Sequence, residues 1–298
     1  MKRVLVTGAS GFIGRALLPA LAGRGFEVHG IARGAQPATP GVSWYAVDLL
    51  TEAGREHALS AARPTHLVHL AWEARPGRYR DDPVNPRWAE ASIDLLKHAR
   101  ACGTSRILGI GSCLEYGAQS RLCDERASPC RPTTLYGQAK LATAEAYVVA
   151  GATWGRVFFP FGPHEVEARL IPSLIRSLRA GQNFDCSHGG QLRDFVYVDD
   201  LAQMIAAVLD SKLTGAVNLA SGEVRSLRSV IEHVAGLLEE RHLVRFGAVD
   251  ATGVDAEPIL AADVSRLRGV TAGMPVVGFE EGAARTLAWW SDRRAGRV

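Results

Sequence analysis

The stretch "RVLVTGASGFIG" at residues 3–14 joins a short apolar run to a glycine-rich turn and the start of an amphipathic segment. Gly8, Gly11 and Gly14 follow one another at intervals of three, directly after the apolar run. Glycine allows a tight turn and a close backbone approach to a ligand, and the first turn of a helix offers free N–H groups to a pyrophosphate. The stretch therefore predicts a strand, a turn and a helix that form a dinucleotide site, with contacts from Gly8, Ser10, Gly11, Phe12, Ile13 and Gly14.

Strand and helix patterns alternate through the first half of the chain. Candidate strands cover residues 3–8, 26–33, 42–49, 65–72, 106–112 and 153–159, and amphipathic helical patterns separate them. Strands that are almost continuously apolar are buried on both faces, and their alternation with helices is typical of a parallel sheet. The pattern predicts an α/β fold with a doubly wound parallel sheet. Later helices are expected at 171–181 and 199–211, with Ser226 capping another.

Bulk composition excludes several classes of protein. The 298 residues are 47% apolar and 22% charged, which is ordinary for a globular chain of one large or two fused domains. No apolar stretch approaches the roughly 20 residues that span a bilayer. The first apolar run is only Val4 to Val6, too short for a signal peptide, so no membrane partner and a cytoplasmic location are expected.

Neither the cysteines nor the net charge indicates a metal site or a nucleic-acid partner. The five cysteines are odd in number and contain no CxxC, which predicts free thiols. Cysteine and histidine pairs with zinc-ligand spacing are lacking, so no metal is expected. The net charge of +3 is small and spread along the chain, so no nucleic-acid partner is expected.

The end of the second candidate strand bears on the choice of cofactor. An acidic residue at this point normally binds the adenosine ribose, but this chain has Ala32 followed by Arg33. A cation suits a ribose 2′-phosphate, so NADP is preferred and NAD is the alternative, unless Arg33 is only a solvated loop residue. Further cofactor contacts are expected where the third and fourth strands end, at Asp48, Leu49, Leu70 and Ala71.

A tyrosine and a lysine four residues apart, Tyr136 and Lys140 in "YGQAK", share one face of a helix, but this spacing alone is common by chance. Together with "TGASGFIG", "HLAW", "IGSCLEYG", "RVFFPFGP", "QLRDFVYVDDLA" and "AVNLASGE", the chain resembles the extended short-chain dehydrogenase/reductase family, in the branch that acts on nucleotide sugars. The resemblance implies a Rossmann-type sheet, a smaller α/β substrate-binding lobe at the C-terminal side and a nicotinamide cofactor. It also implies a homodimer that pairs through the Tyr–Lys helix.

The same resemblance implies a domain division and a catalytic set. The cofactor domain is expected at 1–160 with a return at about 193–219, and the substrate lobe at 161–192 and 220–298. Tyr136 would exchange a proton with the sugar oxygen, and Lys140 would favour the phenolate and hold the nicotinamide ribose. Ser112 would hydrogen-bond the reacting oxygen.

Departures from the family pattern narrow the expected reaction. Dehydratases carry an Asp-Glu pair directly after the serine or threonine, and this chain has Cys113 and Leu114 there. Glu115 begins a Glu-Tyr-Gly run that resembles some 4-keto-6-deoxy-sugar reductases, and it is a candidate accessory residue or a supporting carboxylate. The substrate site is expected to include Cys113, Phe159 in place of a family asparagine, and Arg193 for the diphosphate unless Arg193 pairs with Asp194.

Three functions remain open on these residues. The leading expectation is an NADPH-dependent reductase of the C4 ketone of a nucleotide-linked 4-keto-6-deoxyhexose. The alternative is a nucleotide-sugar 4-epimerase with tightly bound NAD, which would use the same Ser112, Tyr136 and Lys140. The third is a non-catalytic Rossmann protein that senses a nucleotide, although such a protein has no need of the intact tyrosine and lysine.

Overall fold

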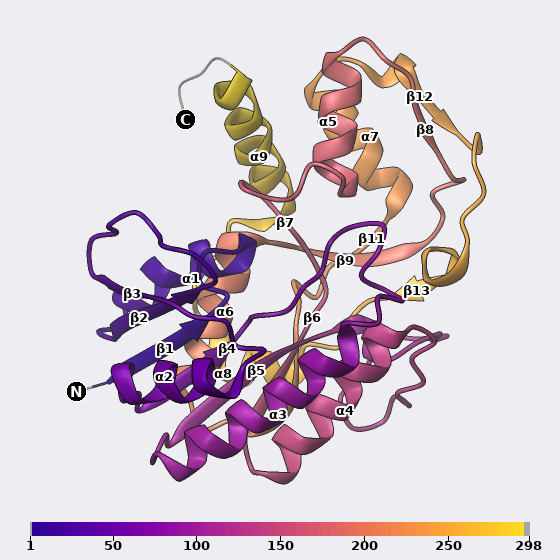
Figure 1. The fold of residues 1–298 in the computed structure, drawn as a ribbon. Coiled ribbons are helices and arrows are strands. Elements are labelled where there is room, and N and C mark those ends of the chain that lie inside the picture. Colours follow the sequence, from indigo (N-terminus) through magenta and orange to yellow (C-terminus); the bar gives the residue numbers. More distant parts are fainter. Residues whose placement is uncertain (1, 295–298) are drawn as a thin grey trace.

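The central element of the fold is a seven-stranded parallel sheet, seen in a computed structural model that describes residues 2–294 (Figure 1). Its strand order is β10-β6-β5-β4-β1-β2-β3, with every neighbouring pair parallel. The order reverses between β1 and β4, and ligands of open parallel sheets bind beyond the carboxyl ends of the strands at such a reversal. The strands are β1 (Arg3–Thr7), β2 (Glu27–Ala32), β3 (Val42–Ala46), β4 (His66–His69), β5 (Arg106–Ser112), β6 (Thr153–Val157) and β10 (Gly215–Leu219).

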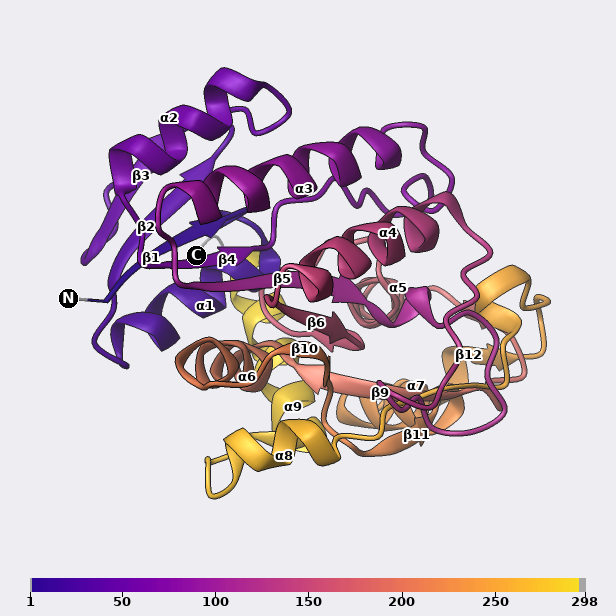
Figure 2. The same ribbon diagram turned by 90° about the horizontal axis from the view of Figure 1, so that it is seen from below.

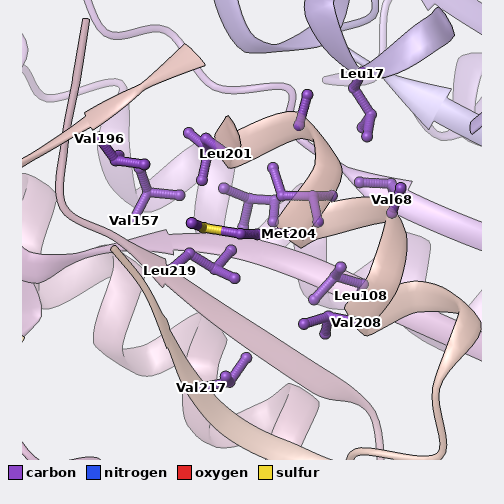
Figure 3. Close-up of a cluster of buried hydrophobic side chains, with 14 of the residues drawn as sticks. Leu17, Val68, Leu108, Val157, Val196, Leu201, Met204, Val208, Val217 and Leu219 are labelled. Carbon is purple, nitrogen blue, oxygen red and sulfur yellow. The ribbon is translucent and has the colours of Figure 1, made fainter. Parts of the chain in front are cut away.

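Helices cover both faces of this sheet (Figure 2). One face packs against α1 (Phe12–Ala22) and α6 (Val198–Asp210), with α8 (Ser265–Thr271) beside α6. The other packs against α2 (Glu52–Ala62), α3 (Asn85–Ala101) and α4 (Leu135–Val149). Figure 3 shows the first of these cores, where Leu201, Met204 and Val208 of α6 lie against strand residues such as Val68 and Leu108. Burial on both faces explains why inner strands such as β1 and β5 are mainly apolar.

A second, smaller sheet surrounds β9 (Leu192–Tyr197). It pairs antiparallel with β11 (Val224–Ser226) and parallel with β7 (Phe159–Phe161) and β13 (Ile259–Leu260). A third apolar cluster joins this sheet to its helices. The remaining elements are η1 (Cys113–Glu115), α5 (Leu170–Arg179), β8 (Phe184–Cys186), α7 (Leu227–Leu237), η2 (Arg241–Leu243), β12 (Val244–Phe246), η3 (Gly253–Ala256) and α9 (Gly278–Arg294).

The doubly wound parallel sheet predicted from the sequence is confirmed, with differences at strand ends. The apolar run 153–159 is not one strand, because β6 ends at Val157 and β7 begins at Phe159 in the smaller sheet. β9 also lies in the smaller sheet, so the chain returns to the large sheet with α6. Ser226 caps α7 as predicted, accepting a hydrogen bond from the Ser229 N–H at 3.1 Å. The boundaries of the two expected domains stay predictions. In residues 2–294, no helix combines the length and the apolar character needed to cross a membrane.

The turn between β1 and α1 has room only for glycine at two positions. Gly8 has a φ of 68°, and a Cβ on it would lie 2.9 Å from the Ala71 nitrogen at the end of β4. A Cβ on Gly14 would lie 2.4 Å from the Gly8 carbonyl oxygen. The glycine spacing therefore brings the first turn of α1 against β1 and β4 more closely than any side chain would allow.

Replacing Gly14 with alanine tests this close approach. We expect Gly14→Ala to lower the free energy of unfolding by about 1–3 kcal/mol, because the added methyl group clashes with backbone atoms that cannot rotate away. Urea unfolding followed by circular dichroism gives the value. The matched control is Gly34→Ala, where the added Cβ meets no atom within 4 Å. Equal unfolding midpoints for the two variants would contradict the packing argument.

Candidate functional site

The candidate site lies at the carboxyl edge of the large sheet, where β5 ends beside the first turns of α4. Ser112 is the last residue of β5, and η1 follows at once. The Ser112 hydroxyl accepts a hydrogen bond from the Leu114 N–H at 3.2 Å, while Glu115 accepts one from the Ser112 N–H at 2.8 Å. This reciprocal cap holds Ser112 in place, and the Ser112 side chain also interacts with the Tyr136 phenol.

Tyr136 is buried beneath aromatic neighbours. Its N–H donates to the Arg80 carbonyl at 2.8 Å, and its ring meets those of Tyr79 and Trp72 edge-on, with centroid distances of 4.9 and 6.1 Å. Burial raises the pKa of Tyr136, Tyr79 adds to the rise, and the interaction with the Ser112 side chain opposes it. Within the protein's own field the phenol therefore keeps its proton, which suits a group that donates a proton to an oxygen.

Lys140 lies one turn further along the same face of α4, as the four-residue spacing predicts. Its side chain is buried, and Nζ donates a hydrogen bond to the Ile110 carbonyl at 2.8 Å. Nζ also lies 3.8 Å from the Trp72 ring centroid and 5.9 Å from that of Tyr136. Burial lowers the pKa of Lys140, and the charge of Glu115 opposes that change. The charge of this lysine thus depends on a few close groups.

The glycine turn is shaped to receive a pyrophosphate. Gly11 is the N-cap of α1 and makes no side-chain cap, so the first-turn amides are left for a ligand. Together with the space that Gly8 and Gly14 leave empty of side chains, this fits a dinucleotide cofactor. Ser10, Phe12 and Ile13 lie in the same turn and first helical residues, as expected.

The other expected cofactor residues lie around this turn. Arg33 follows β2 and is exposed, with its guanidinium 3.9 Å from the Glu73 carboxylate, which also pairs with Arg75 at 3.0 Å. Asp48 is exposed and accepts a hydrogen bond from the Leu50 N–H at 3.0 Å. The Leu49 side chain belongs to the hydrophobic core. Leu70 and Ala71 supply the backbone atoms that lie beside Gly8.

Two of the residues expected to contact the substrate, Arg193 and Cys113, are buried. Arg193 is buried, and its guanidinium donates to the carbonyls of Leu192, Val254, Asp255 and Glu257 at 2.8–3.3 Å. It makes no ion pair with Asp194, whose carboxylate accepts hydrogen bonds from Ser221 and Gly222. The Arg193 guanidinium lies 5.6 Å from the Phe159 ring centroid. Cys113 is buried, and burial raises the pKa of its thiol, which suits a packing residue better than a nucleophile.

Loop residues complete the site, and sequence reasoning did not assign them. Trp72 covers Lys140, and Tyr79 covers Tyr136. The Arg169 guanidinium lies 5.3 Å from the Tyr79 ring centroid and brings a positive charge to this edge. Glu165 follows β7 and is buried. These residues lie in segments without helical or strand periodicity, so no sequence pattern predicts that they meet at the site. Trp72 is the exception, because it belongs to the "HLAW" motif.

A cluster of potential metal ligands lies outside this site. Glu52, Glu56 and His98 bring ligand atoms within 4.8 Å of one another, and both glutamates are exposed. Acidic groups on a helix surface often gather in this way without an ion, so the expectation that the protein holds no metal stays a prediction.

Comparison with known proteins agrees with this geometry. The sequence pattern of the NAD dependent epimerase/dehydratase family matches residues 4–220. The chain belongs to this family. The match covers the glycine turn, Ser112, Tyr136 and Lys140, and it confirms the resemblance drawn from the sequence motifs.

Individual relatives of this epimerase/dehydratase family member act on nucleotide sugars. The chain is 27% identical over 240 residues to a dTDP-6-deoxy-L-talose 4-dehydrogenase (NAD(+)) of Aggregatibacter actinomycetemcomitans, covering 77% of this chain and 88% of that protein. It is 27% identical to a dTDP-glucose 4,6-dehydratase of Streptomyces griseus, covering 98% and 95%. The structure of a UDP-glucose 4-epimerase of Thermus thermophilus in complex with NAD has a TM-score of 0.84 and 26% identity, covering 97% and 99%.

The buried carboxyl of Glu165 yields a pH-dependent prediction. One of its oxygens has no hydrogen-bond partner among the described residues, and burial raises its pKa from 4.5 to about 8. A raised carboxyl pKa stabilises the fold fully below the unfolded value, and the stabilisation is lost as pH rises through the folded value. We expect Glu165→Gln to be more stable than the native chain at pH 9 by on the order of 3 kcal/mol, with little difference at pH 5.

Thermal unfolding at pH 5 and pH 9 measures this difference. The control is Glu167→Gln, because the Glu167 side chain is exposed and pairs with Arg176 at the surface. A Glu165→Gln variant whose stability relative to the native chain is the same at both pH values would show that this carboxyl is not buried.

Proposed function

We propose that the chain is an NAD(P)-dependent oxidoreductase of nucleotide sugars, and that it reduces the C4 ketone of a nucleotide-linked 4-keto-6-deoxyhexose with NADPH as the preferred cofactor. The observation that carries this proposal is the buried phenol of Tyr136, which interacts with the Ser112 side chain and is followed along α4 by a buried lysine. The two positions after Ser112 hold Cys113 and Leu114, which lack the acid–base groups that a dehydratase of this family uses.

The chain's own residues supply the proton and the orientation. A nicotinamide cofactor, when bound, supplies or accepts the hydride. Tyr136 releases the proton of its hydroxyl to the ketone oxygen, which becomes the sugar hydroxyl. Ser112 hydrogen-bonds the same oxygen and fixes its direction. The ammonium of Lys140 stabilises the phenolate that remains, because opposite charges within about 6 Å favour the ionised phenol.

Support for C4 chemistry comes from the relatives. The 6-deoxy-L-talose dehydrogenase is named for redox chemistry at C4 of a dTDP-linked 6-deoxyhexose, which is the reverse of the reduction proposed for this chain. That relative uses NAD according to its name. The preference for NADPH therefore rests on Arg33, and on Ala32 standing where an acidic residue would bind the ribose.

A nucleotide-sugar 4-epimerase is the second candidate, favoured by the likeness to the Thermus epimerase that holds NAD. It would use Tyr136, Lys140 and Ser112 to oxidise C4 and reduce it again from the other face. A non-catalytic nucleotide sensor is a minor third candidate. Mixing the protein with a dTDP- or GDP-4-keto-6-deoxyhexose and NADPH separates the three. Stoichiometric loss of NADPH supports the reductase. Release of NAD on denaturation, with no net loss of NADPH, supports the epimerase. If neither result is obtained, the nucleotide sensor is the remaining candidate.

Tyr136 is the first residue to replace. We expect Tyr136→Phe to lower kcat at least 100-fold and leave the Kd of the cofactor unchanged, because only the proton donor is lost. Tyr147→Phe is the matched control, since Tyr147 lies on the same helix and donates its hydroxyl to the Ser92 carbonyl at 3.3 Å. Turnover that survives in Tyr136→Phe would assign the proton donor to another group.

The cofactor preference depends on Arg33. We expect Arg33→Ala to weaken NADPH binding about 10-fold and leave NADH binding unchanged, because only NADPH carries the 2′-phosphate. Fluorescence titration with both cofactors measures the two Kd values. Arg75→Ala is the control, because Arg75 shares the Glu73 carboxylate but does not follow β2. Tighter binding of NADH than NADPH by the native chain would overturn the preference.

We also infer a homodimer that pairs through α4. The end of this helix exposes Val148 and Val149, the latter with 88% of its surface accessible, and Leu135 is exposed at its start. Apolar side chains of this size on one helix suit a second copy of the chain. Sedimentation equilibrium at working concentration gives the oligomeric state, and a monomer there would reject the dimer.

A further inference from the structure

Glu115 is fully buried, and its carboxylate accepts hydrogen bonds from three residues on two neighbouring strands, β5 and β6. The Ser112 N–H donates to it at 2.8 Å, and the Trp154 indole N–H lies 3.0 and 3.1 Å from its two oxygens. The Arg156 guanidinium donates at 2.7 Å. Four short contacts from protein donors satisfy this carboxylate, so it acts as a supporting group behind Ser112.

The backbone of β5 is shaped to accept this carboxylate. A Cβ on Gly111 would lie 2.2 Å from a Glu115 carboxylate oxygen and 2.2 Å from the Trp154 indole nitrogen. The carboxylate therefore lies directly against β5, one residue before Ser112. The neighbouring carbonyl, that of Ile110, accepts the hydrogen bond from Lys140. A single short piece of strand thus separates the buried anion from the buried ammonium.

Few groups near Lys140 stabilise its ammonium form. Its side chain is almost wholly removed from water, and no ion pair to it is found among residues 2–294. Its ammonium contacts the Ile110 carbonyl and the Trp72 ring, both of them neutral groups. Burial lowers the pKa of Lys140, and Glu115 is the group whose charge raises it. Loss of that charge would leave the ammonium without an anion nearby.

Other ionisable groups face Glu115 from the elements around it. Arg156 on β6 pairs with it directly, and its guanidinium also lies 4.6 Å from the Tyr116 ring centroid. The groups that interact with it electrostatically are Lys140 and Tyr136 on α4, Cys113 of η1 and Cys130 of the following loop. Burial raises the pKa values of the cysteines and Tyr136, so these three groups stay neutral near pH 7. Lys140 is the member of this set that can change charge there.

We propose that Glu115 is a positioning residue with two roles: it directs the Ser112 hydroxyl through the Ser112 N–H, and its negative charge keeps Lys140 in the ammonium form. This deepens the proposed function, on which it rests for the role of Lys140. Arg156 holds the carboxylate in place, and Gly111 leaves the space for it. The Glu-Tyr-Gly run after Ser112 thereby acquires a physical role at the active site, although Glu115 itself does not reach the substrate.

The test compares Glu115→Gln with the native chain across pH. For the native enzyme we expect kcat/KM to fall at alkaline pH as Lys140 loses its proton. We expect Glu115→Gln to move this fall by about one pH unit toward lower pH, because the ammonium loses its anionic neighbour. Activity at pH 8 then drops several-fold more than at pH 6. A merely structural defect would lower kcat/KM equally at every pH, and that result would overturn the proposal.

Two further variants keep the test decisive. Glu115→Asp preserves the charge but shortens the reach to the Ser112 N–H, so we expect a lower kcat with the alkaline fall at its native pH. An alkaline fall displaced in Glu115→Asp as in Glu115→Gln would overturn the electrostatic role, and Glu115→Asp remains informative if Glu115→Gln fails to fold. The control is Glu125→Gln, because Glu125 also accepts a backbone hydrogen bond, from the Asn218 N–H at 2.7 Å. It should leave the alkaline fall in place.

Cofactor binding provides a readout that does not need the sugar substrate. Fluorescence titration with NADPH and NADH between pH 6 and pH 9 should show affinity weakening about one pH unit earlier in Glu115→Gln than in the native chain. That shift without turnover of any keto sugar would reject the proposed reaction and support the role of Glu115. Turnover by the native enzyme with no shift in either readout would support the reaction and overturn the role of Glu115.

Discussion

A buried ammonium requires compensation, and much of the candidate site supplies it for Lys140. Taking this charge out of water is costly unless dipoles, aromatic faces or an opposite charge replace the lost hydration. The Ile110 carbonyl and the Trp72 ring supply the first two, at 2.8 and 3.8 Å. Glu115 supplies the third from behind β5. These partners come from separate segments, so one charge requires β4, β5, η1 and α4 to meet.

The same edge of the sheet collects the other functional groups for a topological reason. The carboxyl ends of parallel strands all lie at one edge of the sheet, and the strand order reverses between β1 and β4. The glycine turn after β1 and Ser112 at the end of β5 therefore face the same space without being near in sequence. Gly8 lies so close to Ala71 that β4 is joined to the turn. The glycine turn and the edge that carries Ser112 thus share one base in the large sheet.

The sequence predicts the strands and the Tyr–Lys spacing. It does not predict where the chain leaves the large sheet and joins the smaller one, or which distant segments come into contact. Residues 157–159 are Val-Phe-Phe with no turn signal among them, so periodicity alone cannot show that β6 ends at Val157 and β7 joins another sheet. The Arg193 guanidinium donates to the backbone carbonyls of a segment more than 60 residues away, and its contact with a substrate phosphate stays a prediction. That segment has no pattern that predicts the contact. Tyr79 was not assigned for the same reason, because it lies in an irregular loop.

The sequence by itself shows the features that depend on local chemistry. These are the glycine spacing before α1, the order of strands and helices, the tyrosine and lysine one turn apart, and the lack of an acidic residue at position 32. Each depends on backbone sterics or on neighbours within a few residues. The tertiary structure decided the fate of Glu115. Its partners Trp154 and Arg156 lie 39 and 41 residues away, and their approach excludes the water that would otherwise screen its charge from Lys140. Burial and long-range pairing depend on how β5 and β6 meet, and no local pattern encodes that.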